Sequence, residues 1–326
     1  MDWWTVVLFG RIFLGISMMT PGRDPSKPRR EEAAEPFTEP FTEPLSSDRP
    51  GGSRRTDGNR GQALQVFKEI RRFPEIDSTN SYLVVEARRG APEGMVVVAD
   101  HQRMGRGRIE RSWVAPRGSS LLLSVLMRPS FGAELVHLCS MVVGLAALDA
   151  CRLVAGVEAK LKWPNDLLVA DRKVAGVLAE AVFADGPAGG MADGFAGGMA
   201  VVVGLGLNVN WRGHEGLMVS LDGAATALDR EVGHAIDREQ LLHCFLESLE
   251  DRYGALSSRG GRRSQAREYR TSCGTIGARV RVDINGEQLV GAAVDVTLEG
   301  HLLVDTGTCT KTVVAGDVAH LRPLER

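Results

Sequence analysis

Apolar positions along the chain fall into two patterns that predict different elements. Short continuous apolar runs predict buried strands, at 66–70, 95–100, 121–127, 159–163, 166–170, 173–183 and 200–210. The much longer segment 134–154 is apolar on almost every side, which predicts a helix buried in a core rather than one lying on a surface. The charged, glycine-containing segment 103–112 interrupts these patterns and is expected to be a loop.

Capping residues predict two further helices. Ser78 lies in a polar cluster (77–79) that is typical of a helix N-terminus, and Gly90 suits the position just after the last turn. Asp237 is expected to cap a helix that runs to about residue 257. The polar segment 259–272 is expected to be either a helix or a linker.

Beyond residue 273 the sequence changes to short alternating runs joined by tight turns. Asn285-Gly286 is the strongest two-residue hairpin signal, and Glu299-Gly300 marks a second turn. These turns predict a small all-β, barrel-like module. Such a module buries too little apolar area to form a large core alone, so we expect it to pack on the main domain.

Two segments have compositions that do not suit a packed core. Residues 21–60 hold seven of the chain's 14 prolines and almost no aliphatic side chains, so we expect 1–60 to be a disordered or non-native extension. Within it, 3–20 is apolar but carries Arg11 in its middle, which disfavours a membrane span and leaves a looser membrane contact as the alternative. The near-repeat 184–199 holds six glycines and is expected to be a flexible insertion with no assigned role.

Length and composition narrow the class of protein. With 326 residues the chain has room for two domains beyond the extension, which we place at 61–272 and 273–326. Its net charge of −2 argues against the overall basic field of a nucleic-acid-binding protein. Its five cysteines include no C-x-x-C pair, so we expect neither a disulfide framework nor a metal cluster, and a reducing cytoplasm as the location.

Four segments carry residues suited to chemistry. They are Asp77-Ser78-Thr79-Asn80; Gln102 with the loop Gly105-Arg106-Gly107-Arg108-x-x-Arg111-x-Trp113; Lys162-Trp163-Pro164-Asn165-Asp166 with Arg172-Lys173-x-Ala175-Gly176; and Gly204-Leu205-Gly206-Leu207-Asn208-Val209-Asn210. The loop is not a dinucleotide-binding fingerprint, because Glu110 stands where a third glycine is needed, and the chain has no P-loop pattern. A glycine-hinged cationic loop suits an enzyme that closes over a polyanion.

Each segment also has an ordinary structural explanation. Taken alone, the arginine loop is more typical of a solvated charge run, and Lys173 is equally typical of an exposed hairpin lysine. Residues 78–80 suit plain helix capping, and glycines in a strand suit close packing between elements. Asp166 fits an Asx turn as well as a contact to ribose or to a metal on phosphate.

In their order along the chain, GRGRxxRxW and KWPNDLxxxxRKxAGxLxE resemble the biotin protein ligase family over about residues 66–324. The resemblance implies a mixed α/β catalytic domain, related to class II aminoacyl-tRNA synthetases, followed by an SH3-like β barrel. Some members add a DNA-binding winged helix. Because 1–60 contains no helix-turn-helix pattern, we expect the monofunctional type without DNA binding. Arg103-Met104 departs from the Gln-Thr-Ala type stretch of relatives, which bears on how the loop hinges.

The resemblance implies a reaction in two steps. The carboxylate of biotin attacks the α-phosphate of ATP–Mg²⁺, which gives biotinyl-5′-AMP and pyrophosphate. A lysine amine of a carrier domain then attacks the mixed anhydride, which gives an amide and AMP. The two anions of the first step repel each other, so the site needs fixed cations, which three loop arginines and Lys173 can supply.

The resemblance also implies roles for single residues. The catalytic residues are Lys173, Arg106 and Arg108, none of which is acylated. Biotin is expected to contact Ser78, Thr79, Asn80, Gln102, Gly105, Arg106, Gly107, Arg108, Lys173, Gly176 and Gly204. The nucleotide is expected to contact Arg108, Arg111, Trp113, Asn165, Asp166, Lys173 and Asn208. The chain is expected to hold no metal of its own, with Mg²⁺ arriving on ATP near Asp166.

Two other functions stay open. A lipoate or octanoate protein ligase shares the fold, but those relatives lack the arginine loop and carry an Arg-Arg…Gly-Gly-Gly stretch that this chain lacks. A non-catalytic biotin-binding or nucleic-acid-binding module is the second alternative, and the presence of Lys173 and all three loop arginines argues against it.

The resemblance implies one protein partner, the biotin carboxyl carrier domain of biotin-dependent carboxylases. We expect no nucleic-acid partner and no stable membrane association, and the resemblance allows a homodimer.

Overall fold

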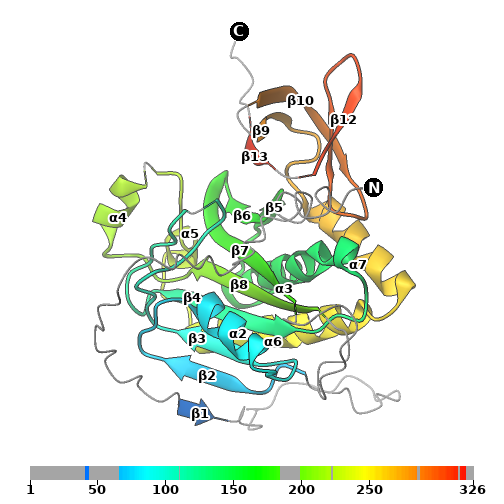
Figure 1. Ribbon diagram of the computed structural model, residues 1–326. Helices are drawn as coiled ribbons and strands as arrows, with labels where there is room; N and C mark the ends of the chain where they lie inside the picture. The colour runs from blue at the N-terminus through cyan, green and yellow to red at the C-terminus, as the bar shows by residue number, and fades with distance from the viewer. Residues whose placement is uncertain are drawn as a thin grey trace, which may run out of the picture.

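The computed structural model describes residues 41–43, 66–109, 111–183, 199–221, 223–284, 287–314 and 316–320 (Figure 1). The larger of its two sheets has the order β1-β2-β3-β4-β8-β7-β6-β5. These strands are Phe41–Glu43 (β1), Ile70–Phe73 (β2), Val96–Ala99 (β3), Ser120–Met127 (β4), Lys160–Lys162 (β5), Asp166–Val169 (β6), Arg172–Val182 (β7) and Ala200–Asn208 (β8). Among them β2 and β3 pair in parallel and the other neighbours pair antiparallel, so the predicted mixed α/β fold is confirmed.

Helices cover both faces of this sheet. Helix α2 (Thr79–Arg88) packs on one face, and α3 (His137–Ala155) with α6 (Arg238–Ala255) packs on the other. Successive side chains of a strand point to opposite faces, so Val97 joins the core under α2 while Val96 and Val98 join the core under α3. Because both faces are covered, the central strands have continuous apolar sequences.

The remaining helices are shorter or lie at the margin. The polar segment that was expected to be a helix or a linker is helix α7 (Arg259–Ser272), which packs against α3. A 3₁₀ turn, η1, and two short helices complete the described part: Ala133–Leu135 (η1), Glu215–Ser220 (α4) and Leu228–Val232 (α5). The caps predicted at Ser78 and Asp237 are confirmed, since both side chains accept backbone N–H groups of the first turn.

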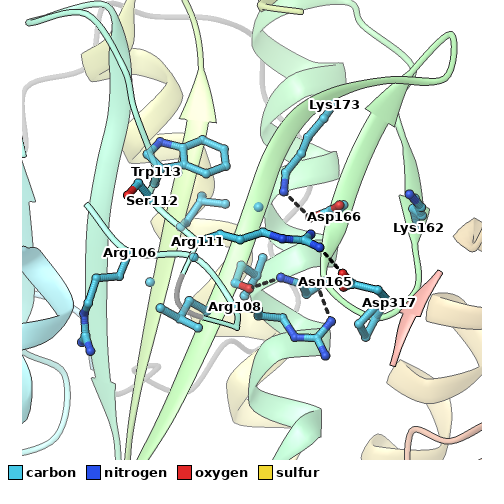
Figure 2. Close-up of a pocket in the computed structure, with 18 of the residues that line it drawn as sticks. Arg106, Arg108, Arg111, Ser112, Trp113, Lys162, Asn165, Asp166, Lys173 and Asp317 are labelled. Atoms are coloured by element: carbon cyan, nitrogen blue, oxygen red, sulfur yellow. Dashed lines mark hydrogen bonds and ion pairs between the residues drawn. The ribbon is translucent and has the colours of Figure 1, made fainter. Parts of the chain in front are cut away.

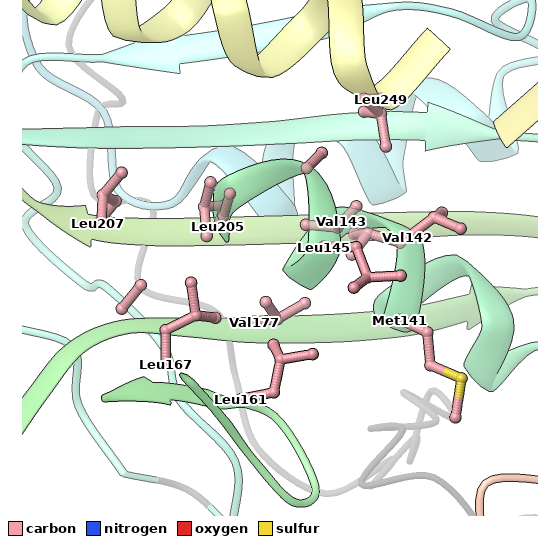
Figure 3. Close-up of a cluster of buried hydrophobic side chains, with 14 of the residues drawn as sticks. Met141, Val142, Val143, Leu145, Leu161, Leu167, Val177, Leu205, Leu207 and Leu249 are labelled. Atoms are coloured by element: carbon pink, nitrogen blue, oxygen red, sulfur yellow. The ribbon is translucent and has the colours of Figure 1, made fainter. Parts of the chain in front are cut away.

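Helix α3 is the centre of the larger core (Figure 3). Its side chains Val142 and Leu145 belong to the same buried cluster as Leu205 of β8 and Leu249 of α6. The segment Ala133–Ala155 is long and apolar enough to cross a membrane by length and composition, but it is mostly buried inside the protein. It is therefore the buried core helix that the sequence predicts at 134–154.

The strand predicted at 66–70 is wrong, because the strand here is β2 at Ile70–Phe73. Residues 66–69 are irregular and are held by tertiary contacts instead. The carboxylate of Glu250 on α6 accepts the N–H of Val66 at 2.8 Å, and the Phe67 ring lies 5.8 Å from the ring of Tyr253. Val66 and Phe67 are therefore apolar because they pack against α6, and not because they belong to a strand.

Residues 1–60 were predicted to be disordered, but within them Phe41–Glu43 form a strand. This strand, β1, pairs antiparallel with β2. Pairing of this kind uses main-chain groups of an otherwise open sheet edge, so composition gives little sign of it. The other residues of 1–60 lie outside the described residues, as do 184–198 of the predicted insertion. The two strands that flank that insertion, β7 and β8, pair with each other.

The predicted all-β C-terminal module is confirmed as an antiparallel sheet of order β12-β11-β10-β9-β13. It lies beside β5 and β6 at one end of the large sheet (Figure 1). Its strands are Arg279–Ile284 (β9), Glu287–Val296 (β10), Leu302–Asp305 (β11), Thr310–Val313 (β12) and Asp317–His320 (β13).

Side chains of the main domain bind main-chain groups of this sheet. Trp163 Nε1 donates to Gly300 O at 2.8 Å, and His137 Nε2 contacts Leu298 O at 2.7 Å. Gly300 has φ +78°, and a Cβ there would lie 2.6 Å from the His137 ring. Only glycine therefore satisfies both the turn and the close contact. These contacts hold the C-terminal sheet in a defined position against the main domain.

The buried His137 predicts a pH dependence of stability. Burial lowers the pKa of His137 from 6.5 to about 4. The unfolded chain therefore takes up a proton below pH 6.5 that the folded chain does not, so the free energy of unfolding should fall between about pH 6.5 and 4, by up to about 3 kcal/mol. Urea unfolding of the protein and of His137→Gln at pH 7 and pH 5 measures this. The variant should lose part of the pH dependence, whereas replacing the exposed His243 of α6 should not; equal pH dependence in all three would contradict it.

Candidate functional site

A cavity of about 410 Å³ lies between the large sheet and the C-terminal sheet, and all four candidate segments line it. Figure 2 shows how residues of the arginine loop and of the β6–β7 hairpin lie in it. Most of the residues that the sequence singles out line this cavity. They are Ser78, Thr79, Asn80, Gln102, Arg106, Gly107, Arg108, Arg111, Trp113, Asn165, Asp166, Lys173, Gly176 and Gly204. Segments far apart in the chain are thus brought together by strand pairing and by the docking of α2.

Gly105 and Asn208 are predicted site residues that do not line the cavity. Asn208 is buried, and its Nδ2 donates to Thr226 O at 2.9 Å. A Cβ at Gly105 would lie 2.3 Å from Trp113 O, and Trp113 N donates to Gly105 O at 2.8 Å. Gly105 therefore lets the two limbs of the arginine loop approach each other.

One end of the cavity is formed by uncharged polar groups at the start of α2. Ser78 caps the helix, so the capping explanation is correct for this residue, and its side chain also lines the cavity. Gln102 Oε1 accepts both the N–H and the hydroxyl of Thr79, at 2.8 and 3.1 Å. Asn80 is buried beside them. This end suits a neutral ligand group that offers both donors and acceptors.

The other end of the cavity is cationic. Lys173 Nζ lies 2.6 Å from Asp166 Oδ1 and 5.4 Å from the centre of the Trp113 ring. The β6–β7 hairpin places this pair, since Asp166 begins β6 and Lys173 lies at the start of β7. The main chain of Lys173 is fixed on both sides, because its N–H donates to Ala224 O and its carbonyl accepts from Thr226 N, both at 2.8 Å. The lysine is therefore a positioned charge and not a loose hairpin side chain.

Two loop arginines extend this cationic end. Arg108 Nη1 donates to the uncharged Asn165 Oδ1 at 3.2 Å, and its buried Nε makes no hydrogen bond to the described residues. Burial, aided by the like charge of Arg111, lowers the pKa of Arg108, against the opposing effects of Asp317 and Asp166. A half-buried cation with spare donors and only a neutral hydrogen-bond partner favours an anionic ligand. The solvated charge run is therefore the wrong explanation for Arg108.

Arg111 and Arg106 are placed differently. Arg111 Nη2 is paired with Asp317 of β13, so the loop reaches the C-terminal sheet. Arg106 points away from Lys173 and Asp166 (Figure 2) and donates through Nη2 to the buried Glu180 at 2.6 Å. The cavity therefore gathers Arg108, Arg111 and Lys173 at one end, and it does not bring the guanidinium of Arg106 to them.

The Trp113 indole rests on two strand glycines. A Cβ at Gly206 would lie 2.5 Å from Trp113 Cε2, and one at Gly176 would lie 3.0 Å from Trp113 Cζ3. The ring therefore packs directly on the backbone of these two glycines, and a side chain at either position would occupy the space of the ring. Gly204, the predicted glycine of the same strand, instead lies against Asn80, where a Cβ would come within 2.2 Å of Oδ1.

The sequence misses several residues of the site. Gly206 stands in the singled-out segment GLGLNVN, and its alternation with Gly204 was the available signal. Glu180 is the last residue of the motif KWPNDLxxxxRKxAGxLxE, and its charge stands in an apolar strand, but the sequence analysis assigns it no role. The C-terminal sheet adds Arg281, Asp283, Gln288 and Asp317 to the lining. These four lie in strands of the C-terminal sheet in which most solvent-facing positions are charged or polar. The sequence therefore does not distinguish site residues from ordinary surface residues there.

A metal ion has few ligands of its own in this site. No cluster of three or more His, Cys, Asp or Glu side chains suited to a metal occurs among the described residues. Asp166, with the amide Asn165 next to it, offers one carboxylate at the cationic end. One carboxylate fits a magnesium ion that is held mainly by the phosphates of a bound nucleotide.

Comparison with protein families gives two matches. Residues 73–190 match the biotin/lipoate A/B protein ligase family, and residues 275–321 match the biotin protein ligase C-terminal domain. The first match covers the arginine loop and the β6–β7 hairpin, and the second covers the C-terminal sheet.

Comparison with single proteins gives relatives that match over most of both chains. The chain is 38% identical over 262 residues to a biotin–[acetyl-CoA-carboxylase] ligase of Mycobacterium tuberculosis, which covers 78% of this chain and 90% of that protein. It is 28% identical to the bifunctional ligase/repressor of Escherichia coli, over 78% of this chain and 74% of that protein. A solved structure of an Aquifex aeolicus biotin protein ligase, in complex with biotin and ATP, matches with a TM-score of 0.64 and 25% identity, over 78% of this chain and 99% of that one.

Gly206 offers a test of the packing beneath Trp113. Since an added methyl group has no room there, we predict that Gly206→Ala displaces the indole and increases acrylamide quenching of its fluorescence. The Trp113 signal is isolated by subtracting the spectrum of a matched Trp113→Phe protein. Gly254→Ala on α6, where a Cβ meets no atom within 4 Å, is the control and should leave quenching unchanged. Unchanged quenching in Gly206→Ala would show that the ring does not rest on this glycine.

Proposed function

The chain belongs to the biotin protein ligase family, and from that premise we propose that its cavity activates biotin with ATP and transfers it to a lysine of a carrier protein. Members named biotin–[acetyl-CoA-carboxylase] ligase make a carbon–nitrogen bond, and this chain is a ligase of that class. The observation that carries the proposal is the division of one cavity into a neutral polar end and a cationic end. That division matches a molecule with a neutral ureido ring and a carboxylate tail.

In the first step an oxygen of the biotin carboxylate attacks the α-phosphorus of ATP and pyrophosphate leaves. Both reactants are anions, so the step requires positive charge that is already in place. Lys173, Arg108 and Arg111 supply positive charge at this end of the cavity. The predicted contacts of Ser78, Thr79, Asn80 and Gln102 with the ureido ring are supported by the uncharged donors and acceptors at the other end.

In the second step the lysine amine of the carrier attacks the acyl carbon of biotinyl-5′-AMP. A C–N bond forms, the acyl–phosphate bond breaks, AMP leaves and the amine loses a proton. Lys173 acts here as a charge and a hydrogen-bond donor and does not become acylated. Mg²⁺ would enter with ATP as part of that substrate and neutralise phosphate charge, and Asp166 would offer it a carboxylate at the cationic end of the cavity.

The nearest alternative, a lipoate or octanoate ligase, is disfavoured by the comparisons. The family model for the catalytic domain covers biotin and lipoate ligases alike. The C-terminal match is to a domain of biotin protein ligases, and the relative at 38% identity is a biotin ligase over 90% of its length. The proposal therefore names biotin as the acid that is activated.

The remaining parts of the proposal concern partners and place. We take the acceptor to be the biotin carboxyl carrier domain of a carboxylase, as the names of relatives indicate. The acidic net charge and the lack of a helix-turn-helix pattern support a ligase that does not bind nucleic acid. We further propose a cytoplasmic protein without stable membrane association, supported by its cysteine usage, and the resemblance allows a homodimer.

Isotope exchange tests the first step. We predict that the protein exchanges labelled pyrophosphate into ATP when biotin is present, because formation of the adenylate is reversible. The same assay with lipoate in place of biotin is the control and should give only background exchange. Exchange with lipoate but not with biotin would contradict the proposal and would indicate a lipoate or octanoate ligase instead.

Lys173 offers a sharper test of the chemistry. We predict that Lys173→Ala lowers the rate of biotin-dependent exchange about 100-fold or more while the protein stays folded by circular dichroism, since one fixed charge is lost from the transition state. Lys160→Ala, which removes an exposed lysine of β5 outside the cavity, should keep full activity. A fully active Lys173→Ala would remove this lysine from the mechanism.

A further inference from the structure

Glu180 is a buried carboxylate next to the cavity that neither step uses. It lies on β7, and its side chain is 4% exposed. Its Oε2 accepts two hydrogen bonds, from Arg106 Nη2 at 2.6 Å and from Asn80 Nδ2 at 2.8 Å. A buried charge is costly unless it is paired and hydrogen-bonded, and this one meets both conditions.

Hydrogen bonds continue from Asn80 back to the arginine loop. Ser124 Oγ lies 2.5 Å from Asn80 Oδ1 and 2.7 Å from Thr79 Oγ1, and Thr79 N donates to Gln102 Oε1 at 2.8 Å. Ser124 has a single hydroxyl proton. When it donates that proton to Asn80, the single Thr79 hydroxyl proton serves either Ser124 or Gln102 Oε1. From Ser124 the donors run through Asn80 to the Glu180 carboxylate, while the Thr79 N–H donates in the other direction, to Gln102.

This chain of hydrogen bonds closes on one segment. It begins at Gln102 and ends at Arg106, which both belong to the base of the arginine loop. Further along the same loop, Ile109 is 63% exposed. The base of the loop is therefore fixed from two sides, while its tip extends into solvent. Arg106, which points away from Lys173, is part of this anchorage (Figure 2).

We propose that Glu180 is a positioning residue, which through Arg106 and Asn80 holds the base of the arginine loop and pre-forms the neutral end of the cavity for biotin. The proposal rests on the proposed function in that biotin is taken as the ligand of this end. It changes the role of one residue, since the Arg106 guanidinium anchors the loop and leaves the reacting phosphate to Arg108, Arg111 and Lys173. Pre-forming the site lowers the ordering cost when the ligand binds.

Trypsin provides a readout that does not depend on ligase activity. The protease must take an arginine side chain into its specificity pocket, so an Arg106 held by Glu180 is a poor cleavage site. In Glu180→Gln the charge is lost, and we expect cleavage after Arg106, relative to cleavage after Arg111, to rise about five-fold or more by mass spectrometry. Asp149→Asn is the matched control, because Asp149 on α3 also accepts from an arginine and a hydroxyl, but outside the cavity.

Calorimetry gives the second readout. Glu180→Gln keeps one oxygen that can accept hydrogen bonds, so we expect the Kd for biotin to rise about ten-fold, and Glu180→Leu, which removes both oxygens, should raise it further. The KM for ATP should stay within about two-fold in Glu180→Gln, since its cationic contacts are intact. Should the charge variants fail to fold, Ser124→Ala removes one hydroxyl of the same chain without removing a charge and should shift biotin binding in the same direction.

The outcomes separate the two proposals. A wild-type protein that binds no biotin would overturn the proposed function, whatever the variants do. A wild-type protein that binds biotin, with unchanged binding and unchanged cleavage after Arg106 in Glu180→Gln and Ser124→Ala, would overturn the role of Glu180 alone. An equal effect of Asp149→Asn on biotin binding would also overturn it, because the loss would then follow from general stability.

Discussion

Several cations concentrated in one cavity repel each other, and this protein offsets part of that cost by giving three of them a carboxylate partner of its own. Lys173 pairs with Asp166, Arg111 with Asp317 and Arg106 with Glu180. Arg108 is the exception among these four, since its described hydrogen-bond partner is a neutral amide. Positive charge is thus held in place before any anion arrives, which is the arrangement that electrostatic catalysis requires.

This constraint also explains why the C-terminal sheet belongs to the site. Asp317 lies on β13, so the partner of Arg111 is available only when the small sheet is docked. Docking depends in turn on contacts of Trp163 and His137 with the turn at Gly300. Trp163 lies three residues before Asp166, the first residue of the β6–β7 hairpin. The same segment therefore contributes both to the interface between the domains and to the cationic end of the cavity.

The arginine loop combines a fixed base with an exposed tip. Its base is held by Gln102, by Arg106 and by the pairing of Gly105 with Trp113. The tip of such a loop can close over a reactive acyl-nucleotide while the residues at its base keep their positions. Exclusion of water protects such an intermediate from hydrolysis, so local order and local freedom are both needed.

Much of the molecule follows from local patterns in the sequence. Buried strands and the core helix α3 are visible as apolar runs, and the caps at Ser78 and Asp237 are visible as polar residues at helix starts, because these preferences act between near neighbours. The motifs GRGRxxRxW and KWPNDLxxxxRKxAGxLxE were enough to identify the family and the cationic part of the cavity lining. Tertiary structure alone decided that Phe67 is buried outside any strand, that Gly206 supports Trp113, and that Arg106 meets Glu180 while Arg111 meets Asp317. Each of these depends on which distant segments the sheet brings side by side, and a charge or a glycine in the sequence does not specify its partner until the chain has folded.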